Sequence, residues 1–287
     1  MSKEGNNKEV IKKEEGALAT TMFEADANAG SQNITQEDLA LPFLKVLMPL
    51  SPEVNKMDGK YVEGAEPGMI FNSVTRELYN GAKGINVLPC HYLKQYVEWQ
   101  DRGTSGGSPV AIHKAGSDIV STTTRDKAKK DRLPNGNYLE TTANHFVVVL
   151  GDSPQTALIS MKSTGLVVSR KWLATILSLK LPYKNKPGVY TPATYSHIYN
   201  LKTVQMSNDK GTWFGWGYSK VGPVTDASVY KMAKEFSERL AKDEVQVKHG
   251  SDESKRIHHI NHLVQTRFLG LGVEARVETP KTNYDRR

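Results

Sequence analysis

The chain has 287 residues, of which 38% are hydrophobic and 24% are charged, and its formal net charge is +7. This composition can form a buried core, although it is more polar than that of an average globular protein. No apolar run approaches the roughly 18 residues that a transmembrane helix needs, and the charged first residues lack the apolar segment of a secretory signal. A single cysteine, Cys90, excludes an internal disulfide and a cysteine-cluster metal site. We therefore expect a protein without a membrane span, in a reducing interior.

Three segments of different composition divide the chain. Residues 1–40 contain four lysines and eight acidic residues, a net charge of −4, with few large apolar side chains. Such a segment buries too little apolar surface to offset the entropy cost of ordering, so we predict a disordered acidic arm over residues 1–38. The folded domain is expected over residues 39–225. A helical and polar C-terminal extension is expected over residues 226–287.

Basic charge is concentrated together with aromatic side chains in residues 153–220. This segment contains nine lysines or arginines, nine aromatic residues and a single acid, Asp209. Lysine and arginine neutralise phosphates, and aromatic rings stack on bases without strong sequence preference. A segment that is both basic and aromatic is therefore typical of a protein that binds single-stranded nucleic acid.

Strands are predicted for the first half of the folded domain. Runs rich in β-branched and aromatic residues occupy residues 69–75, 85–99, 141–150 and 157–162. The second run is long, and Pro89 within it predicts a bend or a sheet edge. Because side chains alternate along a strand, its later part has two faces. One face carries Tyr92, Lys94, Tyr96 and Glu98, and the other carries Leu93, Val97 and Trp99.

Two helices and a hairpin are predicted for the second half. Apolar residues recur at helical spacing over residues 164–179 and 226–242, with Asp226 or Ser228 as the cap of the second helix. Residues 195–206 and 212–221 are typical of a hairpin. Short strands with a helix between the later ones match the oligonucleotide-binding (OB) arrangement of five strands and one helix. We therefore predict a mainly β fold with a few helices, an OB-like antiparallel β-barrel with insertions.

The hairpin carries the densest aromatic pattern. Three alternating residues share one strand face: Phe214, Trp216 and Tyr218. Trp213 shares the other face with Gly215 and Gly217, and Tyr195 and Tyr199 are expected to share a face of the partner strand. An exposed stripe of this kind stacks bases, at roughly 1–3 kcal/mol per base. The same stripe is also typical of the core face of a barrel strand, so both interpretations stay open.

Two groups of basic residues are candidates for phosphate contacts. The first is the charged loop of residues 125–132, where Asp126 and Asp131 cancel part of the charge, so a solvated surface loop is an equally good interpretation. The second group has no acid nearby and favours a function: Arg170, Lys171, Lys180, Lys184 and Lys186. Binding through either group would weaken steeply with salt.

Other chemistry finds little support in the sequence. His258 and His262 are spaced to share a helix face over residues 254–269, but no third metal ligand has suitable spacing, and a surface helix is the better interpretation. Cys90 has no base with an orienting partner, which favours a buried structural thiol. No phosphate-binding glycine loop, carboxylate pair or Gly-x-Ser-x-Gly motif stands out. We therefore expect no enzyme activity, cofactor or metal.

Several stretches resemble one family of tailed-bacteriophage proteins. The resemblance covers residues 38–220 and is carried by residues 38–45, 50–54, 63–75 and 84–89, with Tyr92, Glu98-Trp99 and Arg102-Gly103. It implies an OB-type single-stranded-DNA-binding protein of the phage replication region, in the cytoplasm of the infected bacterial host. Such proteins usually end in an acidic tail that docks partners, whereas here the acidic segment is at the N-terminal end. We hypothesise that the N-terminal arm docks phage replication proteins instead.

These observations lead to one main prediction and two rivals. We predict sequence-tolerant binding and protection of single-stranded DNA during phage DNA replication or recombination, through a basic groove with stacking aromatics. Homo-oligomerisation is left open. The predicted contact residues are Tyr92, Lys94, Tyr96, Trp99, Lys127, Lys129, Lys130, Arg132, Arg170, Lys171, Lys184, Lys186, Tyr195, Tyr199, Lys202, Trp213, Trp216 and Tyr218. The rivals are a virion or scaffold-type structural protein with a basic interaction face, and a nuclease with a Mg²⁺-binding carboxylate cluster.

Overall fold

The chain divides into two compact units, residues 1–40 and 41–287. The computed structural model describes residues 22–27, 29–33, 40–101, 108–209 and 211–242. In the first unit the described part holds one helical turn at residues 22–25. The predictions made for residues 1–21 and 243–287, including His258 and His262, lie outside the described residues.

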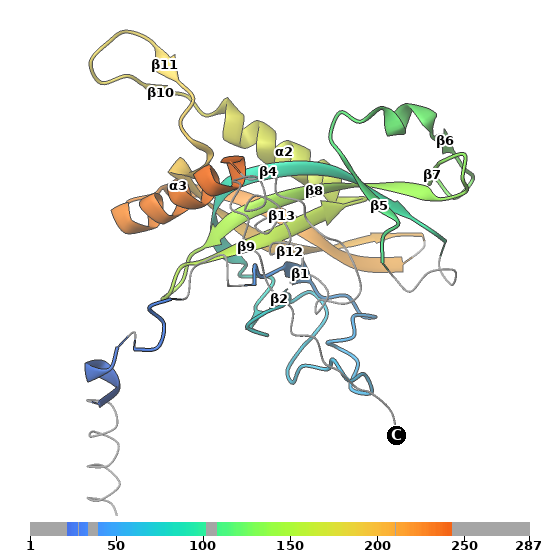
Figure 1. Cartoon of the computed structure of the whole chain (residues 1–287), viewed down its shortest axis with the longest axis horizontal. Helices are drawn as coiled ribbons and strands as arrows, with labels where there is room; N and C mark the ends of the chain where they lie inside the picture. Colours follow the sequence, from blue (N-terminus) through green and yellow to red (C-terminus); the bar gives the residue numbers. More distant parts are fainter. Residues whose placement is uncertain (1–21, 28, 34–39, 102–107, 210, 243–287) are drawn as a thin grey trace, which may run out of the picture. The chain divides into compact units, whose positions relative to one another are not determined.

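Antiparallel strands are the main regular structure in the described part of the second unit (Figure 1). The strands are β1 (Leu44–Val46), β2 (Ile70–Asn72), β3 (Leu78–Tyr79), β4 (Ile85–Trp99), β5 (Ala111–Lys114), β6 (Thr124–Arg125), β7 (Asp131–Arg132), β8 (Tyr138–Val149), β9 (Gln155–Lys162), β10 (Leu181–Pro182), β11 (Val189–Tyr190), β12 (His197–Asn208) and β13 (Gly211–Pro223). The helices are α2 (Gly165–Ser178) and α3 (Ala227–Lys242), with short 3-10 helices η1 (Asp118–Thr122) and η2 (Thr194–Ser196). The predicted mainly β fold with a few helices is confirmed. None of the described helices is both long and apolar enough to cross a membrane.

One curved antiparallel sheet forms the body of this unit. Its strand order is β13-β12-β4-β8-β7-β6, with β5 on β4 and β9 on β8. The edge of β4 that faces away from β8 is shared, because β12 pairs with its first residues and β5 with its last. β1 lies against both β9 and β13, the two ends of the curve, and Phe43 bridges to Leu158. The strands thus enclose a barrel-like core, and the prediction of an OB-like β-barrel is confirmed.

The sheet is packed on both faces. Inside the curve, Trp172 and Ile176 of α2 join a core with Val147, and on the other face Phe236 of α3 joins a core with Val148. The two neighbouring valines point to opposite faces because side chains alternate along a strand. The apolar run at the end of β8 is therefore explained by burial on both sides, as its sequence predicted.

A bulge in β4 decides which of its side chains lie on the α2 side. The register of β4 against β8 shifts between Pro89 and His91, where the sequence predicted a bend. An extra residue reverses the alternation beyond it, so Tyr92 lies on the same face as Val87 and both pack with the α2-side core. Cys90 sits at the shift and is buried as predicted, and this burial raises the pKa of its thiol to about 12.

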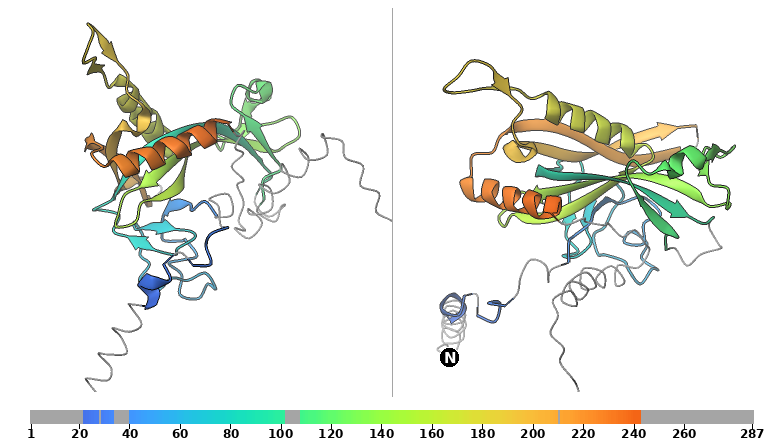
Figure 2. Two further views of the ribbon diagram at one scale, coloured as in Figure 1. Left: turned by 60° about the vertical axis from the view of Figure 1, so that its left-hand side comes forward. Right: turned by 45° about the horizontal axis from the view of Figure 1, so that its top comes forward.

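An arm leaves the barrel where α2 ends. β10 and β11 form a two-stranded ribbon in which Leu181 pairs with Tyr190 and Pro182 with Val189. Figures 1 and 2 show that this ribbon projects away from the barrel and from the sheet. The sequence pattern indicated the basic residues of this segment but did not predict the arm.

Candidate nucleic-acid interface

Helix α2 presents two cations to solvent because its opposite side is fixed on the barrel. Ser169, Trp172 and Ile176 are buried, at the spacing of three and four residues that defines one helix face. Arg170 and Lys171 lie between them in the sequence, so they point away from that face, and both are exposed. The predicted basic pair of this helix is therefore available to a ligand.

Buried contacts hold α2 in place. The Trp172 indole is fully buried, and its ring centroid lies 4.8 Å from that of His145. The Ser169 hydroxyl lies 2.8 Å from His145 Nε2, and Thr175 Oγ1 lies 2.9 Å from the Tyr218 hydroxyl. Burial lowers the pKa of His145 to about 4, so this imidazole is neutral near pH 7. The helix thus offers a rigid base for the cations on its outer side.

The β4 side chains beside α2 extend this basic surface. Tyr92, Lys94 and Tyr96 are half-buried, and Lys94 Nζ lies 5.0 Å from the centroid of the Tyr96 ring. Burial raises the pKa of Tyr92, whereas the charges of Lys94 and Arg170 act to lower it, so strand and helix contribute charge near one hydroxyl. We call these five residues the α2–β4 patch: Tyr92, Lys94, Tyr96, Arg170 and Lys171.

A buried carboxylate marks the end of this patch. Glu98 follows Tyr96 on the same strand face, and its side chain accepts hydrogen bonds from Asn137 at 2.6 Å and Asn135 at 2.9 Å. His113 Nε2 lies 2.9 Å from its other oxygen. Burial raises the pKa of Glu98, but these hydrogen bonds outweigh it and leave the pKa below its usual value. The carboxylate therefore ties β5 and the β7–β8 turn to β4.

Acidic side chains are absent from a long part of the chain around α2. Between Asp152 and Asp209 the sequence contains seven lysines or arginines and no Asp or Glu. Lys162 pairs with Glu140 at 2.9 Å. Within the described residues the other six show no ion pair, and all are exposed: Arg170, Lys171, Lys180, Lys184, Lys186 and Lys202. Their charge is therefore not cancelled by direct contact with a carboxylate.

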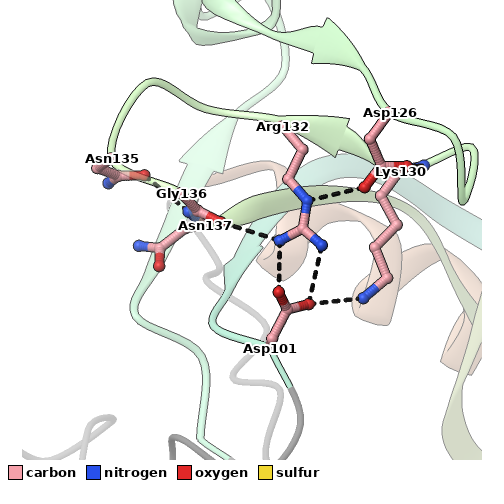
Figure 3. Close-up of polar contacts among 7 residues, drawn as sticks. All are labelled: Asp101, Asp126, Lys130, Arg132, Asn135, Gly136 and Asn137. Atoms are coloured by element: carbon pink, nitrogen blue, oxygen red, sulfur yellow. Dashed lines mark hydrogen bonds and ion pairs between the residues drawn. The ribbon is translucent and has the colours of Figure 1, made fainter.

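The loop of residues 125–132 is different, because three of its five cations pair with carboxylates of the loop or with Asp101 (Figure 3). The Arg132 guanidinium contacts both oxygens of Asp101, at 2.8 and 3.0 Å, and Asp126 at 2.8 Å. Lys130 Nζ lies 2.8 Å from Asp101, and Arg125 pairs with Asp131 at 2.7 Å. The hydrogen bonds from Arg132 and then Lys130 lower the pKa of Asp101 to about 2.

Two predicted phosphate contacts in this loop, Lys130 and Arg132, carry charge that is already paired. Lys130 and Arg132 hold the loop to Asp101 instead of presenting free charge. Both also lie over the Tyr138 ring, at 4.0 and 5.6 Å from its centroid. Asp101 is remote in the sequence and arrives here because β4 pairs with β8. Lys127 and Lys129 are exposed and have no ion pair within the part of the chain that the structure describes.

The aromatic stripe of the hairpin belongs to the barrel core. Trp216 is 7% exposed and Tyr199 of the facing strand is 1% exposed. Tyr218 packs against the same core, and the Phe214 ring lies so close to Gly68 that a Cβ there would approach it within 2.7 Å. Base stacking by Tyr199 and Trp216 is therefore wrong, because β12 and β13 curve over the barrel and turn this face inward.

Two tyrosines that were expected to share a strand face lie on different sides of the sheet. Tyr195 belongs to the short 3-10 helix η2, which precedes β12, whereas Tyr199 is the third residue of β12. Tyr195 packs on the α3 side, with its ring centroid 5.2 Å from that of Tyr230, and Tyr199 lies in the α2-side core. The expected shared face was wrong because the alternation of a strand does not extend into a helical turn.

The remaining predicted residues lie on other surfaces. Trp213 and Lys202 share the outer face of the hairpin, and Trp99 lies on the β4 face opposite Tyr96. The glycines beside Trp213 are not open to a nucleic-acid strand, because a Cβ at Gly215 would lie 3.0 Å from Met206 Sδ. The structure thus brings together the α2–β4 patch and leaves Trp99, Lys202 and Trp213 apart from it.

Comparison with known proteins gives a family. A family model described as "Pam3 phage gp34-like protein" matches residues 12–246. The chain belongs to this phage family. No curated protein and no solved structure matches it. The phage origin implied by the sequence resemblance is confirmed, and the binding of single-stranded DNA stays a prediction, because the family description names no activity.

The candidate site of this phage protein combines basic side chains with aromatic rings. The described residues contain no group of three or more histidine, cysteine or carboxylate side chains that could hold a metal ion. The α2–β4 patch offers exposed guanidinium and ammonium groups beside half-buried phenol rings. Such groups bind phosphates and bases by charge and stacking.

Proposed function

We propose that this phage protein binds single-stranded DNA through the α2–β4 patch. The observation that carries the proposal is the uncompensated charge of Arg170 and Lys171, which are exposed on α2 in a stretch of the chain without any acid. Each phosphate that meets such a cation releases condensed counterions, which drives binding without sequence preference. A cation that is already paired with a carboxylate contributes less binding free energy, because its ion pair must first be broken.

The geometry of the patch favours a flexible strand over a duplex. Arg170 and Lys171 stand on a helix fixed by buried contacts, and Tyr92 of β4 lies close enough to Arg170 for its charge to act on the Tyr92 hydroxyl. Lys94 and Tyr96 follow Tyr92 on the same face of β4. Rings that are half-buried are held in place and still offer an edge or a face to an unpaired base. Bases inside a duplex are already stacked, so only an unpaired strand uses this surface fully.

The biological role that we propose follows from this binding mode. The protein would coat and protect single-stranded phage DNA during replication or recombination, in the cytoplasm of the infected host, without performing chemistry on it.

The acidic segment of residues 1–40 would dock phage replication proteins. Deletion of residues 1–33 tests this docking role. We expect the deleted protein to lose partner binding in a pull-down with the phage replication proteins. The docking role is overturned if both partner binding and DNA affinity are unchanged.

A matched pair of variants tests the DNA site. A fluorescent mixed-sequence oligonucleotide is titrated with the protein at several salt concentrations, and the anisotropy reports the dissociation constant. Replacing Arg170 and Lys171 by Ala should weaken binding roughly 10- to 30-fold at about 0.1 M salt and lower the salt slope by about 1.4. Replacing Lys231 and Lys234 by Ala removes the same charge from α3, on the opposite face of the sheet, where both pair with glutamates, and should have a much smaller effect.

Two results would contradict this function. If the unmodified protein does not bind single strands at low salt, or binds duplex DNA equally well, the α2–β4 patch is not a single-strand site. Light scattering that then shows high-order assembly would favour the rival function, a virion or scaffold-type structural protein. Equal losses in both double variants would mean that only net charge matters.

A further inference from the structure

The β10–β11 arm is a separate basic and aromatic element beyond the α2–β4 patch. Residues 179–193 contain three lysines, Lys180, Lys184 and Lys186, and no acidic residue. All three lysines are exposed, and the ribbon projects from the barrel (Figure 2). Such a projection buries little of its own surface. Stability of the barrel therefore does not explain why the arm contains three lysines and no acid.

The arm holds its aromatic side chains in a defined arrangement. The rings of Tyr183 and Tyr190 stack with centroids 4.9 Å apart and an angle of 33° between their planes. Lys186 Nζ lies 4.1 Å from the centroid of the Tyr183 ring. Although they contact each other, Tyr183 is 39% exposed and Tyr190 is 37% exposed. The stack therefore joins the two strands of the ribbon and still leaves aromatic surface open to solvent.

We infer that this arm is a second contact for single-stranded DNA, in which a base extends the Tyr183–Tyr190 stack and the phosphates meet Lys184 and Lys186. This inference rests on the proposed function of the α2–β4 patch. Three positive charges without an acid complement a polyanion, and two exposed rings complement a base. A two-point contact lengthens the DNA segment that one molecule occupies, since the second site is reached within the same complex.

Charge and stacking are tested separately on the full chain. Replacing Lys180, Lys184 and Lys186 by Ala should lower the salt slope of binding by about 2. Its control replaces three lysines elsewhere by Ala: Lys127, Lys231 and Lys234. The last two pair with Glu235 and Glu238 along α3, on the opposite face of the sheet. This control has the same net charge and should bind more tightly than the arm variant.

For stacking, Tyr190→Ser should weaken binding to a long oligonucleotide at least roughly 5-fold, whereas Tyr190→Phe should bind as the unmodified protein does. The matched control is Tyr230→Ser on α3, because Tyr230 is also 37% exposed and also pairs with another tyrosine ring. Oligonucleotides that contain iododeoxyuridine should cross-link to Tyr190 or Tyr183 under ultraviolet light, and mass spectrometry of the peptides locates the bond.

The outcomes separate this inference from the proposed function. If the unmodified protein binds single strands but the arm variants match their controls, and cross-links fall only on the α2–β4 patch, the arm is not a DNA contact and the proposed function stands. If the unmodified protein binds no single strand at all, both are overturned. A reduced salt slope of the triple lysine variant, together with cross-links to Tyr183 or Tyr190, supports the inference.

Discussion

Two regions of this protein carry clustered basic residues and are held in place in different ways. The α2 segment is fixed to the barrel by buried side chains, Trp172 and Ser169, and its cations Arg170 and Lys171 make no ion pair within the described residues. The loop of residues 125–132 is fixed by its own cations, among which Arg132 and Lys130 contact Asp101. A cation that holds the fold is not free to bind a ligand without a structural cost.

This difference gives a general criterion for locating an interface. A count of basic residues makes both regions candidates for a DNA interface. Only cations without a carboxylate partner keep their full charge to attract a polyanion. Exposed ion pairs are individually weak. Those of the loop can therefore be broken by substitution, and the result can be compared with the unpaired cations of α2. The following changes test each side of the comparison.

The largest expected effect follows from removing the buried anchor of α2. Trp172→Ala should lower the free energy of unfolding by about 3–5 kcal/mol, because the indole is fully buried and the barrel cannot close over the cavity. Urea unfolding followed by circular dichroism measures this loss. Trp213→Ala, at a half-buried site on the outer face of the hairpin, is the control and should cost clearly less. Equal losses would mean that Trp172 is not the anchor.

A second prediction concerns acid and the same anchor. His145 has a folded pKa of about 4 and an ordinary value of 6.5, so the unfolded chain takes up its proton first as the pH falls. The stability from this group is complete above pH 6.5 and decreases by about 3 kcal/mol as the pH falls through the window to 4. Urea midpoints measured across this range should fall more steeply for the unmodified protein than for His145→Gln, in which only the other groups titrate. Parallel curves would contradict the assignment.

The smallest effect is expected in the loop. Asp101→Asn removes the carboxylate that pairs with Lys130 and Arg132, so the thermal midpoint should fall while affinity for single-stranded DNA rises about 2- to 5-fold at low salt, since Lys130 loses its ion pair and Arg132 keeps only the one with Asp126. Arg132→Gln leaves Lys130 paired with Asp101 and removes the charge of Arg132 itself, so its affinity should not rise. If Asp101→Asn binds DNA no better, engagement of these cations is not what excludes the loop from binding.

The sequence predicted most of the regular structure. The long strand of residues 85–99 is β4 without any change of bounds, and the helices of residues 164–179 and 226–242 are α2 and α3 to within one residue at each end. The backbone amides of Ser228 and Val229 donate to Asp226, the predicted cap. These segments have strong periodicity or a local capping contact, which depend only on residues a few positions apart.

Contacts between distant residues set the limit of this prediction. The alternation that placed Tyr195 with Tyr199 fails because Tyr195 lies in the helical turn η2 before β12 begins, and the face of Trp216 is decided by the curvature of the barrel. The arm of β10 and β11 has short strands of two residues each, too short for a periodic pattern. Each error concerns a helical turn, a curvature or a strand length that a count of alternating residues does not record.

By itself, the sequence determined the strands and helices, the phage family and the stretch without acids between Asp152 and Asp209. Only the tertiary structure decided which cations are free and which aromatic rings are exposed. An ion pair such as Arg132 with Asp101 depends on atoms within a few ångströms of each other, contributed by residues far apart in the chain. That proximity is produced by strand pairing and sheet curvature, so the binding surface exists only once the barrel has formed.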